Sequence, residues 1–187
     1  MQNIRVVVTG LGCITPIGIG KDAYWNNLIA GKSGMGRITH FDPTNFSTQI
    51  AAQVNDFDPS LYMDKKDARR ITKFIQFGIA AAKLAVADAS LIINDGNADR
   101  TGVIVGSGIG GIDFLEEQAK VIMEKGPDRV SPFTVPWMIA NMAAGQISIF
   151  LGAKGPNSCT VTACATGTNC IGDAMKIIQR GDADVMI

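Results

Sequence analysis

Hydrophobic positions along the chain alternate between short β-branched runs and longer helical repeats. Residues 4–9 and 101–106 are short, rich in valine and isoleucine, and closed by glycine, which indicates buried strands. Two further strands are predicted at residues 158–163 and 184–187. Strands of this kind need helices on both faces of a sheet.

Helical patterns fill most of the chain between these strands. The strongest is residues 69–90, where apolar side chains recur at i, i+3 and i+4. The other predicted helices span residues 21–30, 113–125, 137–151 and 165–180. We expect residues 31–64 to be irregular with one short strand at 50–54, and residues 131–136 to be extended by their two prolines. The alternation of strands and helices predicts an α/β fold with a parallel sheet.

The last predicted strand lies at the end of the chain. Residues 185–187 are apolar and read as a central strand without its continuation. We therefore expect residues 1–187 to be one incomplete domain, a fragment of a longer protein.

Composition and charge narrow the function classes. Lysine plus arginine equals aspartate plus glutamate, 17 each, so net charge gives no argument for nucleic-acid or anionic-membrane binding. No apolar run reaches the ~18 residues of a membrane span. The four cysteines include no CxxC pair, and His40 is the single histidine, so we expect no zinc site. Reduced thiols in a cytoplasmic protein are the simplest interpretation.

One cysteine stands where chemistry is favoured. Cys164 lies where the predicted strand 158–163 turns into the helix 165–180. A thiol at a helix N-terminus faces free N–H groups and the positive end of the dipole, which favour the nucleophilic thiolate. Its own N–H can also point to a developing oxyanion. The pattern alone leaves two interpretations open, a nucleophile or an inert buried cysteine.

Several motifs resemble, in order, those of the beta-ketoacyl-acyl-carrier-protein synthases, condensing enzymes of the thiolase-like superfamily. The resemblance is carried by Thr162-Ala163-Cys164-Ala165-Thr166-Gly167 and by Gly181-Asp182-Ala183-Asp184. It extends to residues 7–12 and 15–18, to the glycine run 106–111, to Ser131-Pro132-Phe133, and to Gly155-Pro156. The match covers essentially the whole chain and is most similar to the type II branch.

The resemblance implies a thiolase-like fold, a mixed sheet with layered helices, of which this chain is the truncated N-terminal half. It implies decarboxylative Claisen condensation in fatty-acid elongation: Cys164 accepts an acyl group from acyl-carrier protein, and malonyl-carrier protein then supplies the attacking carbon. It implies a cytoplasmic homodimer that needs no metal or cofactor. The two histidines and the lysine that normally assist belong to the second half, and His40 matches neither histidine motif.

The same resemblance assigns roles to other residues. Ile109 matches a residue at the mouth of the acyl pocket, and Phe133 matches one that borders the acyl tunnel near the dimer interface. Lys66, Arg69 and Arg70 match basic positions that dock the acidic carrier protein. Without the resemblance, the first two would be packed apolar residues and the last three a solvated face.

Alternative functions remain at this point. A polyketide ketosynthase or another thiolase-like acyltransferase would share the motifs, whereas a noncatalytic subunit of a condensing pair typically lacks the cysteine. The run Gly106–Gly111 also fits GxGxxG after a strand, which is typical of a dinucleotide-binding oxidoreductase. No strand with a ribose-binding acid follows at the expected place, which counts against that class.

Overall fold

A three-stranded parallel sheet forms the centre of this computed structural model, which describes residues 4–187. The strands are β5 (Thr101–Ile104) in the middle, β6 (Asn157–Ser158) on one side and β7 (Val185–Met186) on the other. All four residues of β5 are buried, as a central strand of a doubly covered sheet requires. The predicted α/β class with a parallel sheet is confirmed.

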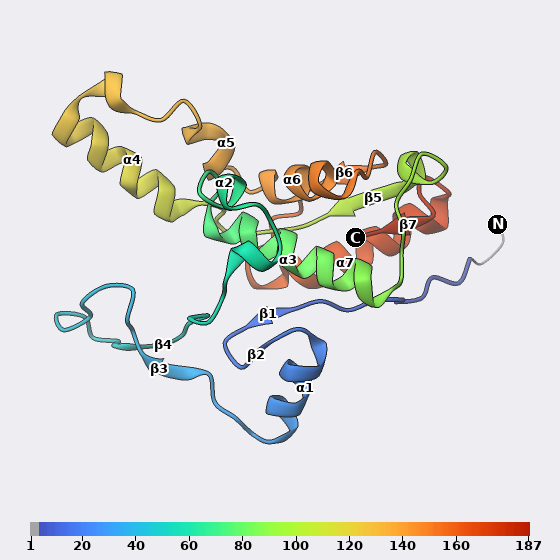
Figure 1. Cartoon of the computed structure of the whole chain (residues 1–187), viewed down its shortest axis with the longest axis horizontal. Helices are drawn as coiled ribbons and strands as arrows, with labels where there is room; N and C mark the ends of the chain where they lie inside the picture. The colour runs from blue at the N-terminus through green and yellow to red at the C-terminus, as the bar shows by residue number, and fades with distance from the viewer. Residues whose placement is uncertain (1–3) are drawn as a thin grey trace.

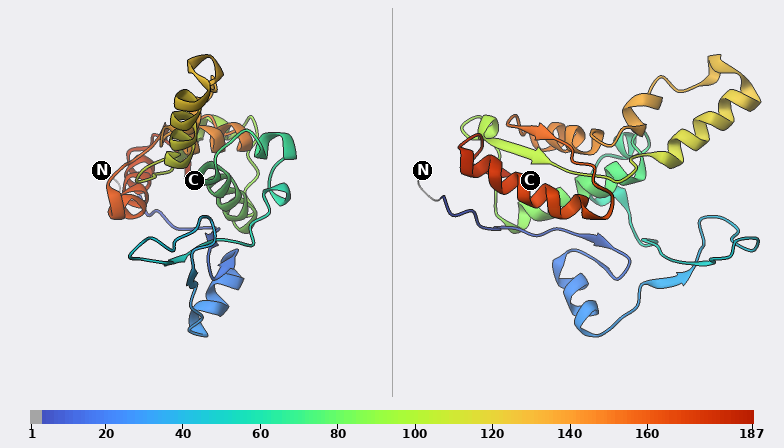
Figure 2. Two further views of the ribbon diagram at one scale, coloured as in Figure 1. Left: turned by 90° about the vertical axis from the view of Figure 1, so that its left-hand side faces the viewer. Right: turned by 180° about the vertical axis from the view of Figure 1, so that it is seen from behind.

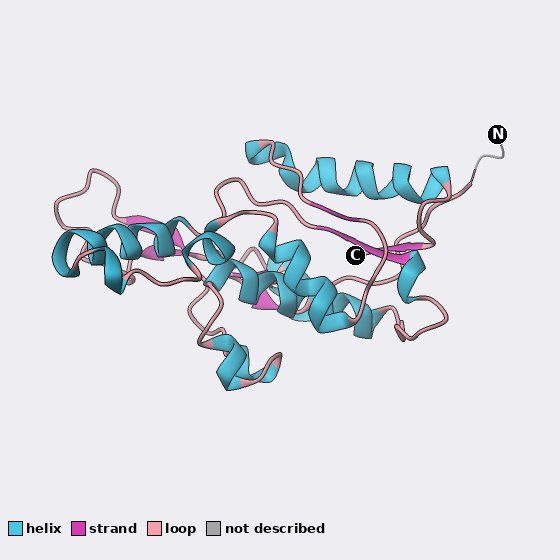
Figure 3. Ribbon diagram, turned by 90° about the horizontal axis from the view of Figure 1, so that it is seen from above, coloured by secondary structure: helices cyan, strands magenta, loops and turns pink. Residues whose placement is uncertain are grey.

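Helices cover both faces of the sheet. α3 (Lys73–Asp88) and α6 (Met142–Leu151) pack against each other on one face, and α7 (Thr166–Arg180) covers the other (Figure 3). The interior contains Ile75, Ile79, Ile147 and Val103, each at most 1% exposed. Full burial of such a side chain stabilises a fold by about 1.5–3 kcal/mol. The helix predicted from this apolar pattern is confirmed, and its buried side chains form part of the core.

Two parts extend away from this body (Figures 1 and 2). One contains α1 (Lys21–Ile29) and two antiparallel ribbons, β1–β2 (Ile14–Thr15, Gly18–Ile19) and β3–β4 (Met35–Arg37, Ile50–Ala52). The other is α4 (Ile112–Lys125), which leads through the turn Pro127–Arg129 to α5 (Thr134–Met138). The exposed surface is 11759 Å², against about 8,600 Å² for a compact monomer of this mass.

The predicted strand at residues 4–9 is wrong. The segment is extended but pairs with no strand among the described residues, and Val7 and Val8 are 59% and 77% exposed. It runs beside α7, where the Gln179 amide donates to the Ile4 carbonyl oxygen at 3.4 Å. A β-branched run indicates a segment suited to a covered sheet, but it forms a strand only where a neighbouring strand supplies the hydrogen bonds.

Two helix predictions need correction. The helix predicted from residue 69 starts at Lys73, and a separate short helix, α2 (Lys65–Ala68), precedes it. The segment predicted as extended at residues 131–136 enters α5, and a break at residues 139–141 separates α5 from α6. Pro136 fits α5 because it lies in the first turn, where its missing N–H has no intrahelical partner.

The remaining helix predictions hold to within one residue at each end, whereas residues 31–64 contain β3 in addition to the one strand expected there. α1, α4 and α7 form where expected, and α7 ends at Gly181 with φ 81°. The strand predicted at residues 158–163 is wrong for most of its length, because β6 reaches only Ser158 and Ala163–Ala165 form a 3-10 turn. Other 3-10 turns lie at Pro59–Leu61 and Ala98–Arg100. Within residues 4–187, no helix has the length and apolar character needed to cross a membrane.

Candidate active site

Cys164 lies on a tight turn directly before α7. The turn is the 3-10 element Ala163–Ala165, and α7 begins at Thr166. Cys164 is exposed, whereas Cys170 is buried and Cys13 and Cys159 are partly buried. Cys164 is therefore not buried among the described residues, and its role as a nucleophile stays a prediction.

The environments of Cys13 and Cys159 disfavour their thiolate forms. Burial raises the pKa of the Cys13 thiol. Burial also raises the pKa of the Cys159 thiol, more than its hydrogen bond with the Ser107 backbone lowers it. Both groups therefore hold their protons more tightly at neutral pH than an ordinary cysteine does. Exposure and position at a helix start distinguish Cys164 from them.

The backbone before Cys164 is unusual. Ala163 has φ 49°, in the left-handed region that non-glycine residues rarely adopt, at a cost of roughly 1–2 kcal/mol. The Ala165 N–H donates to the Thr162 carbonyl oxygen at 3.0 Å, which closes the turn around the cysteine. Among the described hydrogen bonds none uses the Cys164 N–H, so this donor is available to an oxyanion.

The glycine run 106–111 packs against this turn instead of forming a nucleotide cradle. A Cβ on Gly106 would overlap the Thr166 methyl group and the Thr160 carbonyl oxygen, and a Cβ on Gly108 would lie 4.0 Å from Ala163 Cα. Farther along, the Gly111 N–H donates to the Met138 carbonyl oxygen at 2.9 Å. The glycines allow close approach of three backbone segments, which accounts for the GxGxxG spacing.

The two predicted pocket residues lie on connected segments. Ile109 is 68% exposed and follows Gly108, whose Cβ position would lie 4.0 Å from Ala163 Cα in the Cys164 turn. Phe133 is 49% exposed and stacks on Trp137, with ring centroids 5.6 Å apart. The contact between Gly111 and α5 joins the loop of Ile109 to the segment of Phe133. The loop of Ile109 therefore contacts both the turn that carries Cys164, through Gly108, and α5, through Gly111.

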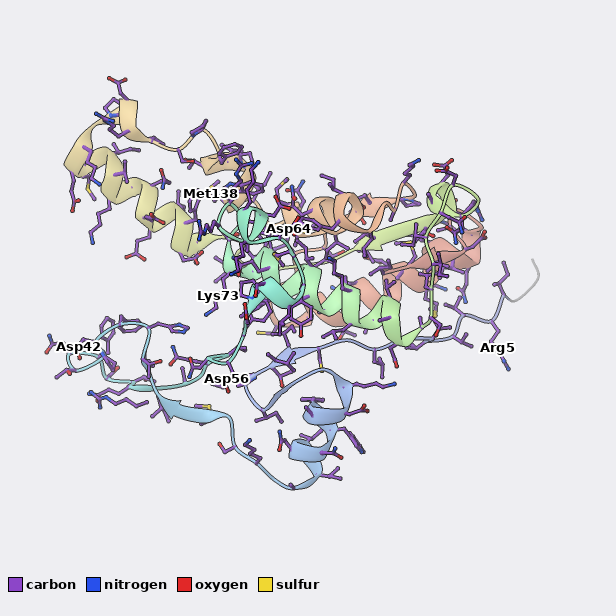
Figure 4. All side chains as sticks on the ribbon, viewed as in Figure 1. Arg5, Asp42, Asp56, Asp64, Lys73 and Met138 are labelled. Carbon is purple, nitrogen blue, oxygen red and sulfur yellow. The ribbon has the colours of Figure 1, made fainter. Side chains whose placement is uncertain are left out.

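The predicted docking residues lie on and just after α2, and all three are exposed. In the described part of the chain, none of Lys66, Arg69 and Arg70 forms an ion pair. Thr72, two residues after Arg70, links this segment to α5, because its hydroxyl donates to the Trp137 carbonyl oxygen at 3.2 Å. Figure 4 labels Asp64 and Lys73 at the starts of α2 and α3, with Met138 of α5 nearby.

Sequence reasoning missed the residues that brace the turn. Thr166 is 6% exposed, and its hydroxyl accepts the Thr162 N–H at 2.9 Å. The Asn169 amide donates to the Thr162 hydroxyl at 2.7 Å. A signal was present, because Thr160 and Thr162 alternate as on an extended segment while Thr166 and Asn169 recur at helical spacing. The positive φ of Ala163 has no such signal.

No group of three or more histidine, cysteine, aspartate or glutamate side chains within residues 4–187 is placed to hold a metal ion. The turn itself offers a thiol, a backbone N–H without a described partner and the start of a helix.

The sequence of this chain is similar to those of known proteins. The family model described as "Beta-ketoacyl synthase, N-terminal domain" matches residues 3–187. The 3-oxoacyl-acyl-carrier-protein synthase 2 of Synechocystis sp. is 50% identical over 187 residues, and that of Staphylococcus aureus strain MRSA252 is 54% identical over 186. In both cases the match covers 100% of this chain and 45% of the relative.

Solved structures agree with the fold. The ishigamide ketosynthase/chain length factor is 30% identical with a TM-score of 0.83, covering 95% of this chain and 44% of that one. A beta-ketoacyl synthase from Burkholderia phymatum STM815 is 27% identical with a TM-score of 0.78, covering 96% and 44%. A type II polyketide acyl-carrier protein in complex with its ketosynthase is 25% identical with a TM-score of 0.79, covering 96% and 48%. The described residues therefore adopt the thiolase-like fold of the N-terminal half of a ketosynthase.

Proposed function

The chain belongs to the beta-ketoacyl synthase family, and we propose that it supplies the nucleophilic cysteine of an enzyme that elongates fatty acids. The observation that carries the proposal is Cys164, an exposed thiol on a constrained turn before α7 with a free N–H beside it. The family match makes the dinucleotide-binding alternative wrong, and the glycine run has the packing role described above.

The active protein in this proposal is longer than residues 1–187. The chain spans about 45% of the length of the curated relatives it matches. Residues 1–187 then form the N-terminal part of a domain whose second half carries the two histidines and the lysine expected from the family resemblance. The large exposed surface of the described residues supports contacts with further protein.

The proposed reaction has two steps at Cys164. In the first, the Cys164 thiolate attacks the carbonyl carbon of an acyl thioester on acyl-carrier protein; a new C–S bond forms, the C–S bond to the carrier breaks, and the carrier leaves as its thiolate. In the second, malonyl-carrier protein loses carbon dioxide, its carbanion equivalent attacks the acyl-Cys164 carbonyl carbon, and the Cys164 thiolate leaves. The Cys164 N–H faces the oxyanion that forms in each attack.

Substrate binding is assigned to the neighbouring segments. We propose that Ile109 and Phe133 border the acyl chain, since the loop of Ile109 contacts the Cys164 turn at Gly108 and contacts α5, on which Phe133 stacks, at Gly111. Lys66, Arg69 and Arg70 would dock the acyl and malonyl forms of an acidic carrier protein, and their lack of ion pairs within residues 4–187 supports this role. A cytoplasmic homodimer without a cofactor completes the proposal.

A polyketide ketosynthase is the second candidate, because two structural relatives are ketosynthases of that kind. Those relatives are 25–30% identical to this chain, against 50–54% for the 3-oxoacyl-acyl-carrier-protein synthases. The higher identity favours fatty-acid elongation.

The test uses the complete protein. It is incubated with an electrophilic thiol-directed acyl mimic, and the modified residue is mapped by mass spectrometry. We expect selective modification of Cys164 and loss of condensation activity in parallel. The matched variant Cys164→Ala should lose condensation by about a thousandfold or more, while Cys13→Ala keeps it. Modification spread evenly over the four cysteines, or full activity of Cys164→Ala, would contradict the proposal.

A further inference from the structure

The residue before Ala163 is held at two separate points by α7. The Thr162 N–H donates to the Thr166 hydroxyl at 2.9 Å, and the Thr162 hydroxyl accepts from the Asn169 amide at 2.7 Å. One more bond continues this line of contacts, from the Thr160 hydroxyl to the Asp173 carboxylate at 3.2 Å. The extended segment and the first half of α7 are therefore joined by a row of polar side chains, which we call the threonine row: Thr160, Thr162, Thr166, Asn169 and Asp173.

Thr166 has little freedom to move within this row. Its side chain is 6% exposed and is pressed by the backbone at Gly106, where any Cβ would overlap its methyl group. The same added Cβ would lie 3.1 Å from the Cys170 sulfur, so the space is closed on that side as well. Thr166 is thus confined to the position in which its hydroxyl accepts the Thr162 N–H.

The turn that carries Cys164 begins and ends in these two residues. Thr162 precedes the left-handed Ala163, and Thr166 begins α7. Together with the bond from the Ala165 N–H to the Thr162 carbonyl oxygen, the Thr162–Thr166 bond closes the turn on both sides of the cysteine. A residue with positive φ persists only where its surroundings hold it, and the threonine row supplies that constraint.

We propose that Thr166 and Asn169 are positioning residues for the reaction at Cys164. They hold Thr162 and thereby keep the thiol at the head of α7 and its N–H free for the oxyanion. This inference rests on the proposed function, because it concerns the placement of the proposed nucleophile. Neither residue touches the substrate; both act through the backbone of the turn.

The test compares variants of the complete protein at Thr166 and Asn169. Thr166→Val keeps the shape but removes the hydroxyl, and we expect the rate of Cys164 alkylation by iodoacetamide at pH 7 to fall about tenfold. The rate is followed from pH 7 to pH 9 to give an alkylation profile for each variant. Condensation should lose kcat by a similar factor with KM for the carrier-bound substrate unchanged, since docking uses a separate segment.

Thr166→Ser and Asn169→Ala supply the decisive comparison. Serine restores the hydroxyl and should return both rates to within about twofold of the parent protein. Asn169→Ala removes only the outer bond and should lower both rates about threefold. Thr168→Val makes the same substitution at an exposed residue of α7 that has no described side-chain bond, and it should change neither rate.

Two results would overturn the inference. One is an alkylation profile of folded Thr166→Val that matches the parent protein; the other is equal loss in Thr166→Ser and Thr166→Val. Where Thr166→Val does not fold, unchanged rates in Asn169→Ala overturn it instead. Failure of the proposed function is distinguishable, because Cys164→Ala would then retain condensation activity whatever the Thr166 variants do.

Discussion

The nucleophile turn and the basic segment at residues 65–70 are held in opposite ways. At the turn, side chains of α7 fix the backbone around Cys164, and the reactive group follows the backbone. In the basic segment, α3 fixes the backbone: the Gln76 amide donates to the carbonyl oxygens of Ala68 and Ile71, and the Lys83 ammonium donates to the Tyr62 carbonyl oxygen. The charged side chains of that segment stay free.

The difference reflects two kinds of work. Bond formation requires the reacting atom to be placed precisely, and hydrogen bonds hold the backbone of the turn on both sides of Cys164. Docking of a charged partner requires an electrostatic attraction that speeds encounter and sets orientation. Exposed basic side chains on a fixed backbone provide it. Substitutions at the turn should therefore act through changes in geometry. The effects of substitutions in the basic segment should depend on ionic strength.

The largest expected effect comes from crowding the turn. Gly106→Ala in the complete protein places a methyl group against Thr166 and Thr160, and such overpacking costs about 1–3 kcal/mol of unfolding free energy. We expect a lower Tm and a loss of condensation activity of between about tenfold and a hundredfold. Thermal melts and steady-state kinetics measure both.

Gly108→Ala is the matched control for this substitution. It adds the same methyl group on the same loop, where the nearest atom lies 4.0 Å away at Ala163 Cα. Its Tm and activity should stay near those of the parent protein. Equal damage from the two alanines would mean that the loop, and not the contact with Thr166, is what matters.

A smaller effect is expected at the basic segment. The double reversal Arg69→Glu and Arg70→Glu should raise the apparent KM for carrier-bound substrate about tenfold at low salt, with kcat nearly unchanged. The difference from the parent should shrink above ~0.3 M salt, because exposed charges are screened. The exposed pair Lys32→Glu and Lys154→Glu changes net charge equally and should leave KM unchanged. An unchanged KM in the arginine variant at low salt would refute docking there.

The smallest effect concerns charges that are paired instead of free. The Arg100 guanidinium bonds both Asp184 carboxylate oxygens, at 2.6 and 3.1 Å, and holds the pKa of Asp184 below its ordinary value of 3.8. A depressed pKa in the folded state means that the pair stabilises above pH 3.8 and that this contribution is lost as pH falls through the folded-state pKa. Asp184→Asn should therefore lower Tm slightly at pH 7, and the gap to the parent should close in acid.

A control for this pair exists on the same surface. Asp95 lies 3.8 Å from Lys154 with both side chains exposed, so Asp95→Asn should change Tm at neither pH. A gap for Asp184→Asn that persists unchanged at pH 2.5 would assign the effect to packing and not to charge.

The sequence predicts those features that depend on local pattern or on motif. The buried run at residues 101–104 and the helix before Gly181 follow from side-chain periodicity alone. Residues 4–9 have a similar run, yet they form no strand, since pairing depends on distant segments that periodicity does not report. Pro136 within α5 shows the same limit, because its place in a first turn depends on where the helix starts.

The residues of the candidate site differ in how far the sequence predicts their roles. Cys164 could be singled out from its position between an extended segment and a helix. The roles of Ile109, Phe133 and the basic residues came from family motifs and stay predictions. The bracing by Thr166 and Asn169 depends partly on the close packing of Gly106 against Thr166, 60 residues along the chain. It depends otherwise on hydrogen bonds to Thr162, whose geometry the turn itself creates.

The left-handed backbone at Ala163 restricts which amino acids can occupy that position. In a saturation library read out by growth on the complete gene, glycine and alanine should survive, asparagine should be partly tolerated, and valine, isoleucine and threonine should be depleted. Selection at the position next to the nucleophile would then act on its positive backbone φ, although its side chain is a single methyl group.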